Sequence, residues 1–270
     1  MAIAAIGDIE LNYHVLGDSG PFVLLVTGFG TRGDTWTPIS RALAGRGFRA
    51  IQFDNRDIGR SSQQEGVDYD ISDMAADALG LLDHLGVKEA HLVGISMGGM
   101  IAEELLVRFP QRFLRAVLLA TWPGGAEAKM PEPALIQKLL SMGDLSDPAE
   151  APGRLRALYQ AITAPTFAEK SPDLIEMAIN FALESPAKPA GLMRQIRAIG
   201  RFSIWDRLPD IKTPVLILHG DADPLIPHEN GVAISRRIPG AELRTLPGVG
   251  HLIPLEAPFE TFGAMMDFLT

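Results

Sequence analysis

The chain has 270 residues, of which 47% are hydrophobic and none is cysteine, and its formal net charge is −9. This composition is typical of a globular protein with a sizeable core, and it excludes a disulfide framework, thiol chemistry and a zinc–thiolate site. The acidic charge argues against nucleic acid as a partner, and no apolar run approaches the length of about 20 residues that a membrane helix needs.

Apolar runs of strand length alternate with helical patterns from the start of the chain. The stretches AIAAI and IELNYHVLG read as two early strands, and FVLLVTG (22–28) and FRAIQFD (48–54) read as strands buried on both faces of a parallel sheet. The next predicted elements are a helix over about 71–85, a strand over 90–95, a helix over about 97–109 and a strand over 113–120. This alternation predicts an α/β fold with a mostly parallel central sheet flanked by helices.

The composition changes between residues 122 and 205. This stretch contains nine of the 20 prolines but six of the 27 glycines, and its nine basic and nine acidic residues balance. It shows helical patterns and no convincing strand, so we expect a helical cap over 122–205 inserted into a core formed by 1–121 and 206–270. The α/β pattern then resumes with a strand over 214–220, a helix near 229–237, a strand over 241–247 and a closing helix near 257–269.

The stretch HLVGISMGGM (91–100) places Ser96 between Gly94 and Gly98. The letters fit G-x-S-x-G between a predicted strand and a predicted helix, which is the setting of a nucleophile elbow. The helix that follows directs the positive end of its dipole at the turn and so favours developing negative charge. A Gly-rich turn with a capping serine would give the same letters, so the presence of a base and an acid decides between the two.

A serine hydroxyl needs a base, and the base needs an orienting acid. Of the six histidines, His251 lies in the Gly-rich loop LPGVGHLIPLE after the last predicted strand, from which it can reach the strand ends. We expect structural or surface roles for the other five. The loop HGDADPLIP offers Asp221 and Asp223 as the acid. The chain order Ser…Asp…His is that of α/β-hydrolases.

These motifs resemble those of α/β-hydrolase-fold serine hydrolases of the carboxylesterase type, over essentially the whole chain. The family's G-x-x-D pattern ends at Asp223, so the resemblance implies Asp223 as the acid, with Asp221 as the alternative. It also implies an oxyanion hole formed by the backbone N–H groups of Met97 and Phe29. Thr27 stands where the family usually has histidine, which leaves the backbone donor in place but puts the packing of this loop in question.

The stretch FDNRDIGRSS (53–62) resembles the family's D-x-R-G-x-G-x-S loop, with Asp57 in place of the usual glycine. Its N-R-D-x-G-R-S variant is similar to that of the aclacinomycin methylesterase group. We expect a structural loop whose charged groups hydrogen-bond backbone near the floor of the active site.

The resemblance implies cleavage of a carboxylic ester through an acyl-enzyme intermediate, with no cofactor and no metal ion. Related dehalogenases and epoxide hydrolases carry an aspartate at the nucleophile position, and Ser96 argues against both. Lactonases, perhydrolases, thioesterases and carbon–carbon bond hydrolases share the triad and stay open. A ligand-binding receptor that retains the triad is an alternative from a different class, because fold alone does not fix function.

Substrate-binding residues are expected in the cap. Trp122, Phe167 and Phe181 are the candidates, although apolar residues of this kind also pack small helical cores. A neutral cap with such residues favours small, uncharged, partly apolar esters.

We expect a cytoplasmic protein with no nucleic-acid or membrane partner, because the first residues lack the basic and long apolar regions of a secretory signal. The oligomeric state stays open.

Overall fold

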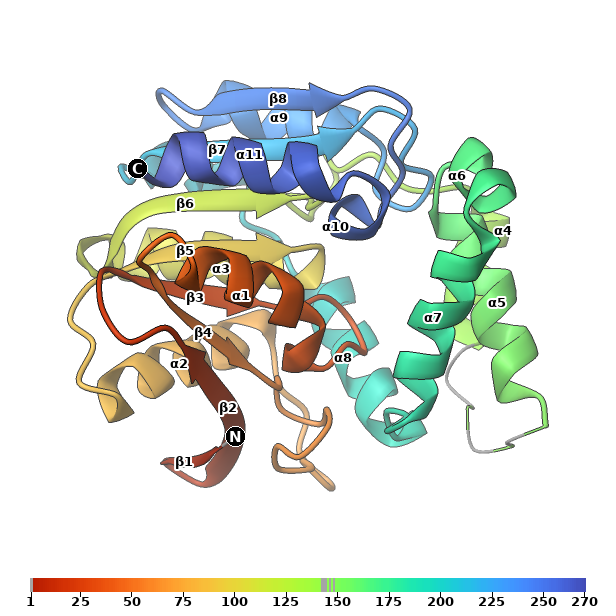
Figure 1. Cartoon of the computed structure of the whole chain (residues 1–270), viewed down its shortest axis with the longest axis horizontal. Helices are drawn as coiled ribbons and strands as arrows, with labels where there is room; N and C mark the ends of the chain where they lie inside the picture. The colour runs from red at the N-terminus through yellow and green to blue at the C-terminus, as the bar shows by residue number, and fades with distance from the viewer. Residues whose placement is uncertain (1, 142–144, 146, 148) are drawn as a thin grey trace.

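A computed structural model describes residues 2–141, 145, 147 and 149–270. Eight strands of this described chain form one sheet in the order β1-β2-β4-β3-β5-β6-β7-β8. The strands are β1 (Ala2–Ile6), β2 (Ile9–Leu16), β3 (Phe22–Val26), β4 (Arg49–Phe53), β5 (Ala90–Ile95), β6 (Phe113–Leu119), β7 (Val215–Gly220) and β8 (Glu242–Leu246). The β1–β2 and β2–β4 pairs are antiparallel and the other pairs are parallel (Figure 1). The predicted mostly parallel sheet is confirmed.

Helices cover both faces of the sheet. They are α1 (Thr37–Ala44), α2 (Ile71–His84), α3 (Met97–Arg108), α9 (Glu229–Arg237), α10 (Ile253–Glu256) and α11 (Pro258–Leu269), with 3₁₀ turns η1 (Gly33–Trp36), η2 (Pro110–Arg112) and η3 (Trp205–Asp210). In β3, Leu24 and Val26 pack with α2 and α3, whereas Val23 and Leu25 pack with α1 and α11. Successive side chains of a strand point to opposite faces, so a strand covered on both sides is apolar throughout.

A second group of helices lies between β6 and η3 in the sequence. In space, this group lies beyond the carboxyl ends of the parallel strands (Figure 1). These helices are α4 (Pro133–Ser141), α5 (Ala151–Ile162), α6 (Pro165–Lys170), α7 (Pro172–Leu183) and α8 (Pro189–Arg201). Each has proline at its first or second position, where the missing N–H costs no helical hydrogen bond. The proline excess of this stretch therefore marks helix starts, and α5 and α7 pack around a small apolar cluster of their own.

The two ends of this helical segment meet at one point. Gly124 and Ser203 form an isolated antiparallel bridge, and the Ile204 N–H donates to the Pro123 carbonyl at 2.9 Å. Gly124 has a φ of 64°, and a Cβ there would lie 2.1 Å from the Phe202 carbonyl oxygen. Only glycine fits such a close approach. The division of the chain into a core and a cap domain stays a prediction.

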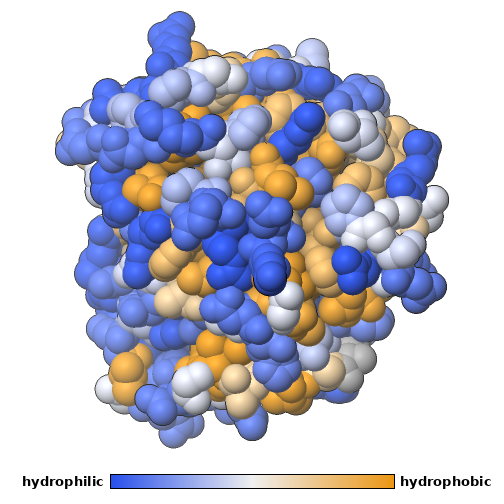
Figure 2. Space-filling view, turned by 90° about the vertical axis from the view of Figure 1, so that its left-hand side faces the viewer, coloured by the Kyte–Doolittle hydropathy of each residue, from blue (hydrophilic) through white to orange (hydrophobic). Residues whose placement is uncertain are grey.

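The far end of the molecule, away from α4–α8, carries hydrophilic residues interspersed with small apolar areas (Figure 2). Across the described ranges, no helix is both long and apolar enough to cross a membrane.

The segments that contain the sequence motifs follow β3, β4, β5, β7 and β8, so they gather at the opposite, carboxyl end of the parallel strands.

Candidate active site

Ser96 occupies the turn between β5 and α3 with a φ of 55°. A positive φ is uncommon for a residue with a side chain and persists only where the surroundings enforce it. The Ser96 N–H donates to the Leu119 carbonyl at 2.9 Å, and the Thr121 hydroxyl donates to the Ser96 carbonyl at 2.9 Å. Both contacts come from β6 and the residues after it, so the neighbouring strand fixes the strained turn.

The glycines around Ser96 allow α3 to approach the sheet closely. A Cβ on Gly94 would lie 2.2 Å from the Gly98 carbonyl oxygen, and a Cβ on Gly98 would lie 2.3 Å from the Val26 carbonyl oxygen. A Cβ on Gly99 would meet the Thr121 side chain at 2.4 Å. The G-x-S-x-G pattern is therefore required by packing between backbone segments, as expected for an elbow.

The loop after β3 runs beside Ser96. A Cβ on Gly28 would lie 3.3 Å from the Ser96 Cβ and 3.8 Å from its Oγ. The next residue is Phe29. In the described chain, neither the Phe29 N–H nor the Met97 N–H donates a hydrogen bond to another residue. Two unpaired backbone donors next to a candidate nucleophile are what an oxyanion hole requires.

Thr27 holds the same loop from the core side. Its hydroxyl donates to the Thr31 carbonyl at 3.0 Å and accepts from Asn55 Nδ2 at 3.2 Å. Asn55 Nδ2 also lies 3.3 Å from the Thr27 carbonyl. The threonine that replaces the family's usual histidine therefore has a defined local role, which is to close the loop onto the segment after β4.

His251 and Asp223 face each other from the loops after β8 and β7. The His251 Nδ1 lies 2.9 Å from the Asp223 Oδ2, and both side chains are buried. The other carboxylate oxygen accepts the N–H groups of Leu225 and Ile226, each at 2.9 Å. The His219 Nε2 lies 3.5 Å from the Asp223 Oδ2 and 2.8 Å from the Ile226 carbonyl oxygen. Asp223 is thus held by two histidines and two backbone donors.

These contacts decide the charge of Asp223. Burial by itself raises the pKa of the carboxyl, but the interactions with His251 and His219 outweigh burial and hold the pKa at about 2. An ionised Asp223 keeps a proton on His251 Nδ1 and leaves Nε2 free to act as a base. Asp221 is exposed, and its carboxylate accepts the Gly248 N–H at 2.6 Å instead. The geometry therefore favours Asp223 over Asp221.

Sequence reasoning missed a carboxylate that organises the loop of His251. Glu256 accepts backbone N–H groups on either side of His251, at 2.8 and 3.0 Å, and the Ala164 N–H at 2.9 Å. The His251 N–H itself donates to the Ile162 carbonyl at 2.9 Å. The loop is therefore tied to the end of α5. The only signal for this role was the position of Glu256 at the end of LPGVGHLIPLE.

Ser96 is partly exposed, and its hydroxyl forms no hydrogen bond with any described residue, His251 included. Hydrogen bonds of this kind are often long in enzymes without ligand and tighten in the complex with substrate. The structure thus aligns His251 with Asp223 and presents Ser96 on a strained turn at the same end of the sheet.

Asp57 links the loop after β4 to helix α8. Its φ of 70° explains why glycine is usual at this position. The carboxylate accepts two hydrogen bonds from Arg194, at 2.7 and 2.8 Å, and one each from the Tyr69 hydroxyl and the Gln64 N–H. Burial alone raises the pKa of Asp57, but these hydrogen bonds outweigh it and lower the pKa. The expectation that the charged groups of this loop hydrogen-bond backbone covers one contact of Asp57, with the Gln64 N–H, but it missed the main partner, which is a cation on α8.

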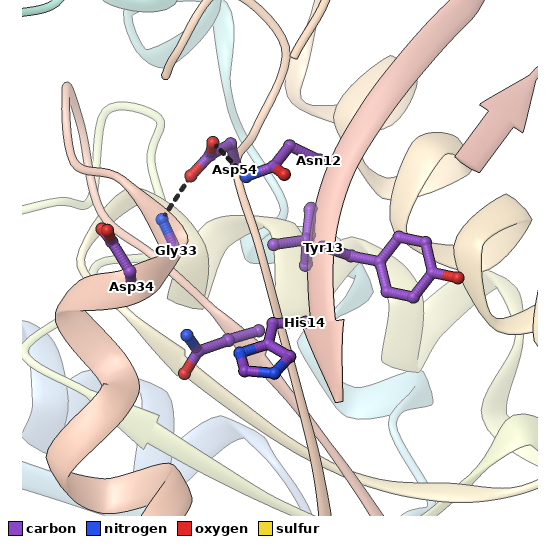
Figure 3. Close-up of a pocket in the computed structure, with 8 residues that line it drawn as sticks. Asn12, Tyr13, His14, Gly33, Asp34 and Asp54 are labelled. Carbon is purple, nitrogen blue, oxygen red and sulfur yellow. Dashed lines mark hydrogen bonds between the residues drawn. The ribbon is translucent and has the colours of Figure 1, made fainter. Parts of the chain in front are cut away.

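Asp54 anchors the start of the same loop (Figure 3). One carboxylate oxygen accepts the Gly33 N–H at 2.7 Å and the other accepts Asn12 Nδ2 at 2.8 Å. The cavity beside these residues has a volume of about 10 Å³, which is room for a single water at most. This cavity is a structural feature and not a place for a substrate.

The three candidates for substrate binding lie in separate surroundings. Trp122 packs against the core cluster that contains Met97, and its Nε1 is buried without a partner among the described residues. Phe167 packs against the cluster between α5 and α7 and lines a cavity of about 390 Å³ between α6 and the segment from β8 to α11. The Phe181 ring lies 4.2 Å from the guanidinium carbon of Arg32. None of the three triad candidates lines this cavity.

Comparison with known proteins agrees with the fold. Residues 21–258 match the α/β hydrolase fold family, so the chain belongs to this family and is a hydrolase. A Synechocystis sp. protein with the provisional name of a non-heme chloroperoxidase is 31% identical, over 97% of this chain and 95% of its own length.

Two solved structures show the same similarity over the whole chain. The enol-lactonase from Burkholderia xenovorans LB400 is 26% identical with a TM-score of 0.86, and 99% of each chain is covered. A thermophilic esterase from Thermogutta terrifontis is 29% identical with a TM-score of 0.81, covering 98% of this chain and 95% of that one. Relatives of different names thus share one fold.

Proposed function

We propose that this hydrolase cleaves carboxylic esters through an acyl-enzyme intermediate, with Ser96, His251 and Asp223 as its catalytic triad. The observation that carries the proposal is the buried His251–Asp223 pair, with 2.9 Å between Nδ1 and Oδ2, at the end of the sheet where Ser96 holds a positive φ. A serine, a base and an ionised acid in this order supply what acyl transfer requires.

The reaction follows from these roles. The Ser96 Oγ attacks the ester carbonyl while His251 Nε2 accepts the hydroxyl proton. The Phe29 and Met97 N–H groups stabilise the oxyanion of the tetrahedral intermediate. His251 then gives its proton to the leaving alcohol. Water attacks the acyl-enzyme with His251 again as base, which releases the carboxylic acid and restores Ser96.

Two neighbouring activities use the same intermediate. A lactone is a cyclic ester whose alcohol stays attached to the acyl group, and an enol-lactonase is among the similar structures. In a perhydrolase, hydrogen peroxide replaces water in the second step, and the name of the Synechocystis sp. relative favours testing this reaction. The sequence of the Asp57 loop also supports a relationship to the aclacinomycin methylesterase group. A receptor that retains the triad would bind ligand with very slow turnover.

We also propose that α4–α8 form a cap, over 122–205, that favours small uncharged esters. The Glu256–Ala164 and Arg194–Asp57 contacts tie these helices to the loop of His251 and to the loop after β4. A covered site excludes water and selects partly apolar substrates. Trp122, Phe167 and Phe181 remain candidates for contact with the acyl group.

The test is the replacement of the nucleophile. Ser96→Ala should lower kcat on a chromogenic ester by about 10⁴-fold or more, because loss of a triad serine removes covalent catalysis. A fluorophosphonate should add one phosphonyl group to the native protein, at Ser96, and none to the variant. Activity of the variant within tenfold of wild type would reject this assignment. A panel of esters, lactones and amides, with and without peroxide, then separates the neighbouring activities.

A further inference from the structure

Gln195 on α8 bridges two backbone groups next to the elbow. Its Oε1 accepts the Gly30 N–H at 3.0 Å, and its Nε2 donates to the Arg56 carbonyl at 3.2 Å. The side chain is fully buried. An amide can both accept and donate, whereas a carboxylate has no donor and a thioether forms only weak hydrogen bonds. Replacing the amide by either of these groups would therefore remove at least one of the two contacts.

The Gly30 N–H belongs to the turn that presents the Phe29 N–H. The Thr31 N–H lies 3.4 Å from the Gly28 carbonyl oxygen, and Gly30 has a φ of 66°, as at the third residue of a type II turn. The peptide between Gly28 and Phe29 is planar and trans, so a carbonyl directed at Thr31 turns the Phe29 N–H to the opposite side. The direction of the oxyanion donor is therefore set by the geometry of this turn.

The central peptide of the turn is held from both sides. The Thr31 hydroxyl donates to the Phe29 carbonyl at 3.0 Å, while Gln195 receives the Gly30 N–H of the same peptide plane. Type I and type II turns differ chiefly in the orientation of this plane. Without Gln195, the orientation depends on Thr31 alone, and the partly buried Gly30 N–H loses its acceptor.

Helix α8 is firmly docked where it carries Gln195. The neighbouring Arg194 forms the buried two-bond pair with Asp57. A Cβ on Gly191 would lie 2.7 Å from the Asp57 Cβ, and a Cβ on Gly30 would lie 2.9 Å from Leu192 Cδ2. Two turns of the helix therefore pack directly on the loops that follow β3 and β4.

We propose that Gln195 is a positioning residue for the oxyanion hole, so that helix α8 of the proposed cap takes part in catalysis through the Phe29 loop. The proposal rests on the proposed function and deepens it. Gln195 acts through backbone and does not touch the reacting atoms. Its loss should therefore weaken stabilisation of the transition state while leaving ground-state binding of the ester nearly unchanged.

The experiment compares Gln195→Met with Arg197→Met on p-nitrophenyl acetate. Gln195→Met keeps the side-chain length but loses both strong hydrogen bonds. Arg197 lies on the same helix in an exposed ion pair with Asp68 at 2.7 Å, so its variant loosens α8 without touching the turn. We expect kcat to fall about 10- to 100-fold in Gln195→Met, the scale of a small misplacement, with KM within threefold of wild type. Arg197→Met should keep both constants within twofold.

The affinity for a transition-state mimic provides a second measurement. A trifluoromethyl ketone forms a tetrahedral oxyanion on the nucleophile, so its affinity should fall by the same factor as kcat in Gln195→Met. Binding of the product carboxylate should stay within threefold of wild type. If kcat falls equally in both variants, or if kcat and ketone affinity of Gln195→Met stay within twofold of wild type, the proposal is wrong.

Amide exchange keeps the test decisive if Gln195→Met does not fold. In the wild-type protein, the Gly30 amide should exchange slowly with solvent deuterium, because its N–H is hydrogen-bonded to the buried side chain of Gln195. Exchange as fast as at an exposed loop amide would overturn the proposal. A wild type that turns over no ester and takes no phosphonyl group at Ser96 would instead overturn the proposed function, and the exchange of Gly30 would still report the turn contact.

Discussion

The elbow of Ser96 and helix α8 border the same site but are held in place by different forces. The elbow depends on glycines that allow backbone segments to touch, such as Gly98 against the carbonyl of Val26. Helix α8 depends on side chains that reach across to the core, namely Arg194 to Asp57 and Gln195 to Gly30. Backbone contacts leave no room for adjustment, whereas side-chain contacts can be removed one at a time. The two regions should therefore respond differently to substitution.

The largest effect is expected in the core, at the acid of the triad. Asp223→Asn should lower kcat about 10⁴-fold, because an amide in place of the carboxylate leaves His251 in the wrong tautomer. The matched control is Asp221→Asn, which should keep kcat within tenfold, since this carboxylate binds the Gly248 N–H. Steady-state kinetics of both variants checks the ranking. A reversed order would transfer the role of the acid to Asp221.

The next effect concerns the contact between helix α8 and the loop after β4. Asp57→Gly restores the residue usual in the family but leaves Arg194 buried without its partner. The free energy of unfolding measured in urea should therefore fall by about 3–5 kcal/mol. The double variant Asp57→Gly with Arg194→Met should recover most of the loss, because no unpaired charge is then left. If the free energy of unfolding of Asp57→Gly lay within 1 kcal/mol of wild type, the pair would contribute little to stability.

The same substitution can be made at a glycine of the elbow and at a glycine of helix α5, which belongs to the same helical segment as α8. Gly98→Ala should destabilise the protein by about 3 kcal/mol, because the added Cβ would lie 2.3 Å from the Val26 carbonyl oxygen. Gly153→Ala on the exposed side of α5 meets no atom within 4 Å and should stabilise by about 0.5–1 kcal/mol through helix propensity. Thermal unfolding of the two variants compares them directly, and shifts of equal sign would contradict the contrast between the regions.

The smallest effect is a pH dependence inside the core. Glu103 on α3 is fully buried, and neither of its carboxylate oxygens has a partner among the described residues. Burial first, and the neighbouring Glu104 second, raise the pKa of Glu103 well above its ordinary value of 4.5. A folded-state pKa above the unfolded one leaves stability intact below about pH 4.5 and lowers it as the pH rises toward the folded-state pKa.

Glu103→Met should therefore stabilise the protein by about 1 kcal/mol at pH 8, because it removes a carboxyl whose buried oxygens have no partner. The gain should shrink toward pH 4, where the carboxyl is protonated in both the folded and the unfolded chain. Urea unfolding at the two pH values measures the difference. A gain of equal size at both would assign the effect to packing and not to ionisation.

The sequence predicted those parts of the fold whose signal is local. Apolar runs located β3, β5, β6 and β7 to within two residues, because strands covered on both faces contain few polar residues. Helix α1 was not predicted, since its eight residues form only about two turns and bury only Ile39, Ser40 and Leu43, which is too short a pattern to distinguish from a loop. The antiparallel edge of β1 and β2 depends on pairing between strands, which periodicity does not report.

The site divides in the same way. Ser96 and its glycines lie within five consecutive residues, so a motif could identify them. Gln195 reaches Gly30 across 165 positions, and Glu256 reaches Ala164 across 92, so nothing in their local sequence marked either residue. Phe167 and Phe181 were chosen from composition alone, which does not tell the face of a helix that a ring occupies.

The bridge between Gly124 and Ser203 has a consequence for modular exchange. Because the chain enters and leaves the helical segment at one pair of neighbouring residues, a segment of any length can be joined there without moving β6 or η3. Helical segments of relatives should be transplantable at this junction. The donor segment must, however, contain a basic side chain that pairs with the buried carboxylate of Asp57. Otherwise the hybrid protein will have an unpaired buried charge under the transplanted helices.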